Sequence, residues 1–217
     1  MNLLAIDTSS QYACVVLSAD GVIYRDIRAI PRQHNQWILP MVQSVLQQAN
    51  LSVQTLDGLA YGVGPGSFVG VRLAAAVAQG LAMGGGIQII PFSSMQAIAM
   101  DAYQITKALS ISVCLDARVN SVYWGNYHWD GQQMQIDQEQ HLALEALAEQ
   151  TPQAYVIGQE SLTLPFECHT HDFCPDPTGL MAHLVRNFHH QAVAPEAALP
   201  VYLQGQQPWQ RQSSTKE

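Results

Sequence analysis

The sequence predicts an α/β protein built from two copies of a βββαβα unit, and three observations support this. The first half opens with three short apolar runs, two of which meet at Asp20-Gly21, a strong hairpin signal. A glycine-rich segment at 62–70 then leads into a long apolar helix. From residue 109 the chain begins again, with apolar strand, aspartate, polar turn, apolar strand and Asp-Gly turn in the same order. We therefore assign an N-terminal lobe to residues 1–106 and a smaller, degenerate C-terminal lobe to residues 107–217.

The elements of the first half follow from apolar spacing and turn residues. Apolar residues recur at helical intervals in 35–50, where Pro40 is acceptable in the first turn because the backbone amides there lack partners. A second helix is expected from Phe68 to the glycines at 84–86, and Ser93 and Gln96 have capping-box spacing before a third. The strands are expected at 2–7, 12–19, 22–30, 56–63 and 87–92.

The second half repeats this order more loosely. After its opening hairpin we expect a third strand near 133–137, a helix near 141–150, a strand at 154–159 and a helix near 178–190. A doubled unit of this kind, each copy opening on a hairpin with an aspartate at its turn, resembles the actin-like ATPase superfamily of ribonuclease H-like folds. In that superfamily the two aspartate turns hold nucleotide phosphates and Mg²⁺ between the lobes.

Composition excludes several classes of function. Of 217 residues, 48% are hydrophobic and 12% charged, which allows a substantial core. Lys and Arg number 9 against 17 Asp and Glu, so direct binding of nucleic acid is not expected, since cations must displace phosphate counterions. The N-terminus has no basic segment, and no apolar run reaches the ~18 residues of a membrane span. The sequence predicts a cytoplasmic protein that does not bind membranes.

The segment 166–174 gathers four side chains that could bind zinc, namely Cys168, His169, His171 and Cys174. Their spacing matches no standard zinc site, and the prolines around them indicate an exposed loop. We therefore expect no metal here. The four cysteines of the chain lack CxxC spacing, which favours reduced thiols.

The two aspartate turns read Asp7-Thr8-Ser9-Ser10 and Asp116-Ala117-Arg118-Val119. Neither contains the glycine that lets backbone amides approach a phosphate. Asp7, Ser9 and Asp116 are thus candidates only for residual nucleotide binding, and a role as turn formers is the alternative. The chain also lacks the P-loop, GxGxxG, GxSxG, HxxxH and HExxH signatures, so no catalytic residue is predicted.

The glycine-rich segment at 64–67 is predicted to form a type II turn, with Pro65 at its second position and Gly66 at its third. Ser67 then caps the following helix. This structural role explains the glycines without a ligand. An anion on the free amides of the helix is the alternative, although no lysine is near.

The two helices at 35–50 and 68–83 are more apolar than one core contact requires. One interpretation is that the protein's own sheet covers them. The other is that together they form a surface for a protein partner. The predicted contact set contains Trp37, Ile38, Met41, Val42, Val45, Val71, Arg72, Ala74, Ala75 and Ala78.

Four segments, "AIDTSS", "HNQWILPMV", "LAYGVGPGSFVGVRLAAAVAQGLA" and "PVYLQ", resemble the bacterial TsaB family, also called YeaZ. The GxGPGSFxGxR run at 62–72 is the most specific of these, and the resemblance weakens after about residue 130. It implies a non-catalytic scaffold that pairs through its two N-terminal-lobe helices with the related enzyme TsaD, and also with the ATPase TsaE. TsaD transfers a threonylcarbamoyl group to N6 of adenosine 37 in tRNAs reading ANN codons.

The resemblance has further implications for partners and cofactors. The chain would contact tRNA only through the complex, would bind no cofactor tightly, and would form a homodimer when alone. ATP or ADP at a subunit interface is left open. The alternative is an active enzyme, either an ATP-hydrolysing actin-like protein or a glycoprotease-type peptidase, against which the missing phosphate-loop glycines and HxxxH pair argue.

Overall fold

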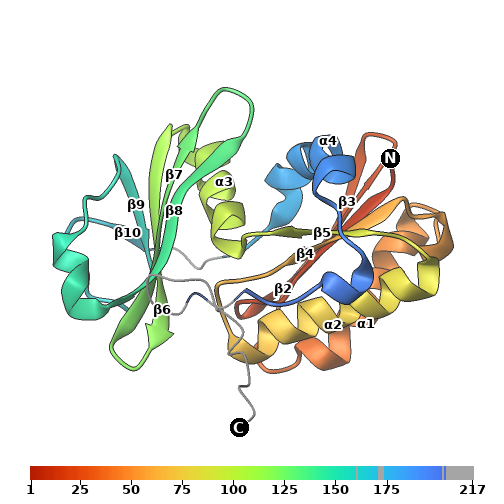
Figure 1. Cartoon of the computed structure of the whole chain (residues 1–217), viewed down its shortest axis with the longest axis horizontal. Coiled ribbons are helices and arrows are strands. Elements are labelled where there is room, and N and C mark those ends of the chain that lie inside the picture. Colours follow the sequence, from red (N-terminus) through yellow and green to blue (C-terminus); the bar gives the residue numbers. More distant parts are fainter. Residues whose placement is uncertain (160, 171–173, 202, 204–217) are drawn as a thin grey trace, which may run out of the picture.

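The computed structural model describes residues 1–159, 161–170, 174–201 and 203, arranged as two lobes, each built on a five-stranded sheet (Figure 1). The first half contains β1 Leu3–Asp7, β2 Tyr12–Ala19, β3 Val22–Ala29, α1 His34–Gln48, η1 Val53–Thr55, β4 Gly58–Gly62, α2 Phe68–Gly85, β5 Ile89–Phe92 and α3 Ser94–Thr106. The second half contains β6 Ser110–Arg118, β7 Ser121–Trp129, β8 Met134–Ala143, η2 Leu144–Glu149, β9 Tyr155–Gly158, β10 His169–Thr170, η3 Pro177–Leu180, α4 Met181–Gln191 and η4 Pro195–Ala197.

The two sheets have the same topology. The first has the order β3-β2-β1-β4-β5, and the second has the equivalent order β8-β7-β6-β9-β10. In each, the first two hairpin-connected pairs are antiparallel, and the remaining neighbours are parallel. The prediction of a duplicated α/β unit is therefore confirmed.

The alternating side chains of β1 and β2 divide between two hydrophobic layers. Leu4 and Ile6 of β1 pack with the inner sides of α1 and α2, whereas Leu3 and Ala5 face a second layer that includes α3 and α4. In Figure 1 these two pairs of helices cover opposite faces of the first sheet. The second layer also contains Ile111 of β6 and other residues of the second sheet, so α3 joins the two lobes through one continuous core.

The helix expected at 141–150 is replaced by an extended strand and a short 3₁₀ helix. The β7–β8 pairing continues to the Ser121–Ala143 pair, and only the six residues of η2 remain for a helical turn. Leu147 fills the small core of the second lobe. Pairing with the long strand β7 gives the backbone N–H and C=O groups of β8 hydrogen-bond partners. In this segment that pairing is favoured over the helix that the apolar spacing predicts.

The helix expected at 178–190 exists as α4, but it packs on the first sheet (Figure 1). The ring of Phe188 lies so close to Gly58 of β4 that a Cβ on this glycine would be 2.0 Å from it. Val193 then forms a bridge with Ile89 of β5. The lobe boundary at 106/107 stays a prediction from the sequence repeat, but by contact this late segment lies with the first sheet.

The starts and ends of the helices partly match their predicted signals. Ser67 and Ser93 cap α2 and α3, and Gly86 ends α2 in the left-handed conformation, as predicted. The capping box is incomplete, because the Gln96 side chain donates to the Met134 carbonyl at 2.7 Å. Pro40 is the seventh residue of α1 and does not lie in its first turn. Proline has no N–H to donate to the carbonyl one turn earlier. Because Pro40 is exposed, water can bond that carbonyl instead.

Candidate functional site

The Asp7 turn, at the end of β1, is buried at Asp7, Thr8 and Ser9. The Asp7 carboxylate is buried, accepts the Ser9 backbone N–H at 2.7 Å through Oδ1, and accepts the Ser94 hydroxyl at 2.5 Å through Oδ2. Burial raises the pKa of Asp7 above its ordinary value, although hydrogen bonds from Ser9 and Ser94 oppose the rise. This carboxylate links β1 to the start of α3, a role that the sequence did not reveal for Ser94.

The glycine-rich loop packs directly against this turn. Ser67 donates its backbone N–H to the Ser9 carbonyl at 2.6 Å, and the Thr8 hydroxyl donates to the Gly70 carbonyl at 2.7 Å. An added Cβ on Gly66 would lie 2.5 Å from the Ser9 carbonyl oxygen. Two neighbouring glycines are equally constrained. A Cβ on Gly62 would lie 1.9 Å from Asp7 Oδ2, and a Cβ on Gly70 would lie 1.9 Å from the Thr8 carbonyl oxygen. The glycines therefore allow two protein segments to meet, and a bound phosphate is not needed to explain them.

The loop conformation corrects the predicted type II turn. The residue with positive φ is Gly64, at 96°, and Gly66 has no positive φ; the Gly64–Pro65 peptide is cis. A type II turn requires positive φ at its third position, which would be Gly66. The contact of Gly66 with Ser9 fixes a different backbone path.

The Asp116 turn is the equivalent feature of the second lobe, at the end of β6. Asp116 is exposed and accepts the Arg118 backbone N–H at 2.7 Å, while its own N–H donates to the Gln159 side chain at 2.9 Å. The next residues, Arg118 to Asn120, all have positive φ. Within the described residues no hydrogen bond or ion pair joins Asp7 or Ser9 directly to Asp116.

A polar contact between the lobes was missed by the sequence reasoning. Ser93, the cap of α3, donates its hydroxyl to Glu139 of β8, and the Tyr127 hydroxyl donates to the same carboxylate oxygen at 2.8 Å. Burial raises the pKa of Glu139, against the effect of these two donors. A glutamate in a predicted strand carries no sequence signal for such a contact, which arises only when the second sheet meets α3.

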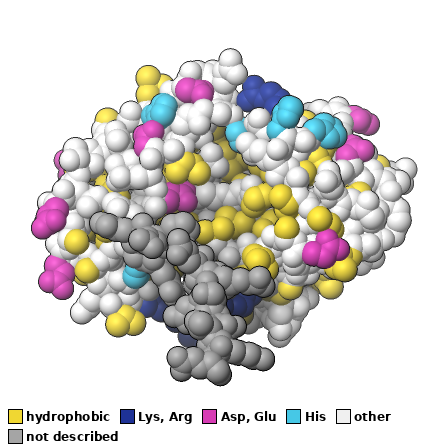
Figure 2. Space-filling view, in the orientation of Figure 1, with side chains coloured by type: hydrophobic (Ala, Val, Ile, Leu, Met, Phe, Trp, Pro, Cys, Tyr) yellow, Lys and Arg dark blue, Asp and Glu magenta, His cyan; other side chains and the backbone are white. Residues whose placement is uncertain are grey.

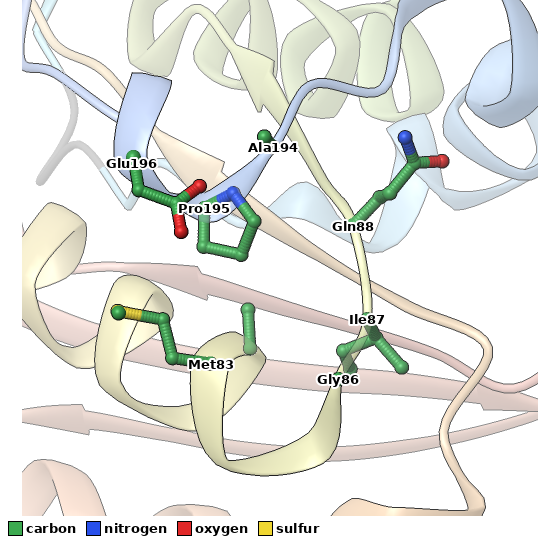
Figure 3. Close-up of a pocket in the computed structure, with 8 residues that line it drawn as sticks. Met83, Gly86, Ile87, Gln88, Ala194, Pro195 and Glu196 are labelled. Carbon is green, nitrogen blue, oxygen red and sulfur yellow. The ribbon is translucent and has the colours of Figure 1, made fainter.

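One surface pocket of about 330 Å³ lies at the C-terminal end of α2 (Figure 3). The polar side chains among its lining residues are Gln88 and Glu196, which Figure 3 shows on opposite sides. It has no nucleophile or cationic side chain in its lining. This lining offers no catalytic arrangement. Its other residues are Ala82, Met83, Gly86, Ile87, Ala194 and Pro195.

Eight of the ten predicted partner residues lie in the core of the first lobe and not on its surface. The eight are Ile38, Met41, Val42, Val45, Val71, Ala74, Ala75 and Ala78. The physical reason is that a stripe at helical spacing marks the side of a helix that faces its own sheet. Of the remaining two, Trp37 is 40% exposed, and Arg72 is partly exposed and lies over the Phe68 ring at 3.2 Å.

The outer sides of α1 and α2 carry other apolar side chains. Leu39 on α1 and Phe68, Val69 and Met83 on α2 are exposed, and we call these four side chains the outer helix face. Trp37 lies on the opposite flank of α1 from Leu39, with Arg28 of β3 over its ring. The two helices are in contact and lie on the same side of the sheet (Figure 1). α1 contains no Asp, Glu, Lys or Arg, and the only such residue of α2 is Arg72. A solvated helix ordinarily carries several charges on this side, so the outer helix face is unusual.

By length and composition α2 could also cross a membrane, since its 18 residues have a mean hydropathy of 1.4. This helix is not an unbroken apolar run, because Arg72 and Gln79 lie within it. The core helix of a soluble protein passes the same test, and a third of this helix is buried inside the chain. We attribute the apolar character of α2 to two sets of side chains: those buried in the core and those on the outer helix face.

The predicted Cys and His cluster is divided in the structure. Cys168 packs with the small core of the second lobe, and the His169 ring stacks on Tyr155 at 4.2 Å. Cys174 instead contacts Cys14 of β2. His171 lies outside the described residues, among which no group of three potential ligands could hold a metal ion.

Positive charge is sparse on the face shown in Figure 2, where Lys and Arg side chains form no continuous patch. Hydrophobic side chains gather near the centre of the same view. This distribution agrees with the low number of cations in the sequence. It does not resemble the basic stripe of a protein that binds nucleic acid directly.

Duplicated sheets of this order, each with an aspartate turn after its first strand, define an actin-like, ribonuclease H-like protein. Residues 25–188 match the family model described as "TsaD: tRNA N6-adenosine threonylcarbamoyltransferase". Within this class the chain belongs to the TsaB (YeaZ) family, as its relatives show.

The TsaB protein of Escherichia coli is 41% identical over 130 residues, which are 60% of this chain and 56% of that protein. The TsaB protein of Bacillus subtilis is 32% identical over 74% of this chain and 72% of its own length. The structure of YeaZ from Pseudomonas aeruginosa covers 93% of this chain and 99% of its own, with 32% identity and a TM-score of 0.83. The chain spans about half the length of the first curated relatives it matches.

The burial of Asp7 predicts a pH dependence of stability. Because the pKa of Asp7 is raised in the folded state, the folded chain binds this proton more tightly than the unfolded chain, and the free energy of unfolding falls as pH rises above about 4 through the folded-state pKa. Asp7→Asn should remove this fall, gaining about 1.4 kcal/mol at neutral pH per unit of pKa shift.

Urea unfolding of both proteins at several pH values measures this difference. Ser94→Ala, which removes a donor to the carboxylate, should extend the fall to higher pH. Wild-type and Asp7→Asn curves that run parallel from pH 4 to 7 would show that Asp7 is not destabilised by burial.

Proposed function

We propose that the chain is a non-catalytic scaffold subunit for formation of threonylcarbamoyladenosine in tRNA. In this function it pairs with TsaD, together with TsaE, so that TsaD transfers the threonylcarbamoyl group to N6 of adenosine 37. The proposal is supported by the name of its TsaB relatives, "tRNA threonylcarbamoyladenosine biosynthesis protein TsaB", and by the match to the TsaD family model. A cytoplasmic location is part of this proposal.

The observation that carries the proposal is the outer helix face. Leu39, Val69 and Met83 of this face are exposed, and they lie on two helices whose inner sides are already packed in the core of the first lobe. Ala76 and Gly80, also exposed on α2, lack side chains large enough to keep another helix away. A partner with a similar pair of helices would bury this surface, and the related lobe of TsaD is the occupant that the family match favours.

The Asp7 turn supports a role without catalysis. Both oxygens of the carboxylate have protein donors, and the adjacent loop fills the space beside the turn. A nucleotide phosphate at this turn would have to displace the loop. Any ATP or ADP would therefore bind at a subunit interface, and tRNA would be held by the partner subunits, since the chain has few cations.

The proposal is tested by reconstitution. Light scattering should give the mass of a heterodimer when TsaD is added, and of a homodimer without it. Threonylcarbamoyl transfer to tRNA should require both proteins, and the isolated chain should neither hydrolyse ATP with Mg²⁺ nor modify tRNA. Saturable ATP hydrolysis by the isolated chain that is lost in Asp7→Ala would overturn the scaffold proposal in favour of an active enzyme.

A further inference from the structure

Two cysteines far apart in the sequence lie side by side in the structure. The Sγ atoms of Cys14, in β2, and Cys174, before η3, are 3.4 Å apart, which is van der Waals contact. Both are free thiols. A disulfide bond has a length of about 2.05 Å, so the sulfurs need to approach by only about 1.4 Å to form one.

Both cysteines lie in or next to regular secondary structure. Cys14 lies in a strand that pairs on both sides, with Asp7 opposite it on β1 and Ile27 on β3. Cys174 is followed by Pro175 and by Asp176, whose buried carboxylate caps η3 at Thr178 and lies 3.5 Å from Arg25 of β3. The two thiols therefore do not need to search for each other, which gives a high effective concentration.

The two thiols differ in their exposure to solvent. Cys14 is fully buried, and contact with the Cys174 thiol, burial and the nearby Asp7 and Asp176 raise its pKa well above the ordinary value. Cys174 is partly exposed and is the sulfur that a small oxidant reaches first. The remaining cysteines, Cys114 and Cys168, lie together in the small core of the second lobe, and among the described residues no hydrogen bond joins their sulfurs.

We propose that Cys14 and Cys174 form a site of oxidative modification, which closes to an intramolecular disulfide in the presence of hydrogen peroxide. The Cys174 sulfur attacks the peroxide, the O–O bond breaks, and Cys174 becomes a sulfenic acid as one water leaves. The Cys14 sulfur then attacks the Cys174 sulfur, the S–O bond breaks, and the released hydroxide takes the Cys14 proton to leave as a second water. Two thiols are oxidised to one disulfide while one peroxide is reduced to two waters.

The bridge would join β2 of the first sheet directly to the segment that returns from the second lobe. It closes a loop of more than half the chain, so it should restrict the unfolded state strongly. The expected increase in melting temperature is roughly 5–15 °C, reversed by a thiol reductant.

The test uses the full chain, first reduced and then treated with hydrogen peroxide in the presence of a metal chelator. Remaining thiols are alkylated in denaturant, and the protein is digested with trypsin without reductant. The expected product links the peptide 1–25 to the peptide 119–186, which contains both Cys168 and Cys174. Cys168→Ala should keep this link and the increase in melting temperature, whereas Cys174→Ala should lose both.

Two results would overturn the proposal. One is a bridge between other cysteines, such as Cys114 with Cys168 or Cys168 with Cys174, in the folded wild-type chain. The other is a Cys14 that is still alkylated after Cys174 has been oxidised to the sulfinic acid, since the two sulfurs would then not be in reach of each other.

Discussion

Replacing Gly70 by alanine should lower the free energy of unfolding by about 3 kcal/mol. The new Cβ would lie 1.9 Å from the Thr8 carbonyl oxygen, a backbone atom. That oxygen cannot easily move, because the Thr8 hydroxyl is bonded to the Gly70 carbonyl and Asp7, Thr8 and Ser9 are all buried. Either α2 must shift away from the Asp7 turn or the turn must open, and urea unfolding would measure the loss.

Gly80→Ala is the matched control, because it is the same substitution in the same helix. Gly80 is exposed, and its Cβ would meet no atom within 4 Å. The higher helix propensity of alanine should therefore raise the free energy of unfolding by about 0.5–1 kcal/mol. If both variants changed stability in the same direction and by a similar amount, the tight contact between α2 and the Asp7 turn would be disproved.

Val69→Glu should weaken the pairing with TsaD by at least about 100-fold, which is about 2.7 kcal/mol. The side chain is 72% exposed on the outer helix face, so a carboxylate costs little in the free chain. It lies in the first turn of α2, where a negative charge interacts favourably with the helix dipole. In the complex the same carboxylate would be removed from water, and this loss of solvation opposes binding even if Arg72, three residues further along α2, pairs with it.

Isothermal titration calorimetry with TsaD measures the effect, after an unchanged thermal melt has shown that the variant is folded. Leu109→Glu is the control: Leu109 is 60% exposed in the loop after α3, which lies on the other face of the sheet from α2. It should bind TsaD like the wild type. A folded Val69→Glu that also binds like the wild type would show that the partner docks on another surface.

Most of the residues predicted to contact a partner are instead buried against the protein's own sheet. Apolar residues at helical spacing, such as Met41 and Val45, correctly indicated an amphipathic helix, but their regular spacing was the mark of packing on their own sheet. The sequence signal for the outer face was weaker: α1 and α2 have almost no charged residues where a solvated helix would have several. Of the predicted contact set, only Trp37 and Arg72 are accessible.

The backbone conformation of the glycine-rich segment was also only partly predictable from the sequence. Its composition predicted a tight loop, and Ser67 was correctly identified as the cap of α2. The sequence could not show that Gly66 and Gly70 face the Asp7 turn, because that contact joins segments about sixty residues apart. The type II turn was wrong for this reason: local rules describe an isolated loop, and here a distant strand determines its conformation.

The sequence by itself determined the class of fold, the duplication and most of the strands and helices, because these depend on local apolar spacing and on turn residues that act within a few positions. Only the tertiary structure decided that α4 packs on the first sheet, that Glu139 and Ser93 join the lobes, and that Cys14 meets Cys174. Each of these contacts brings together residues far apart along the chain. Their free energy comes from burial and hydrogen bonding in the assembled core, and no short segment of sequence contains that information.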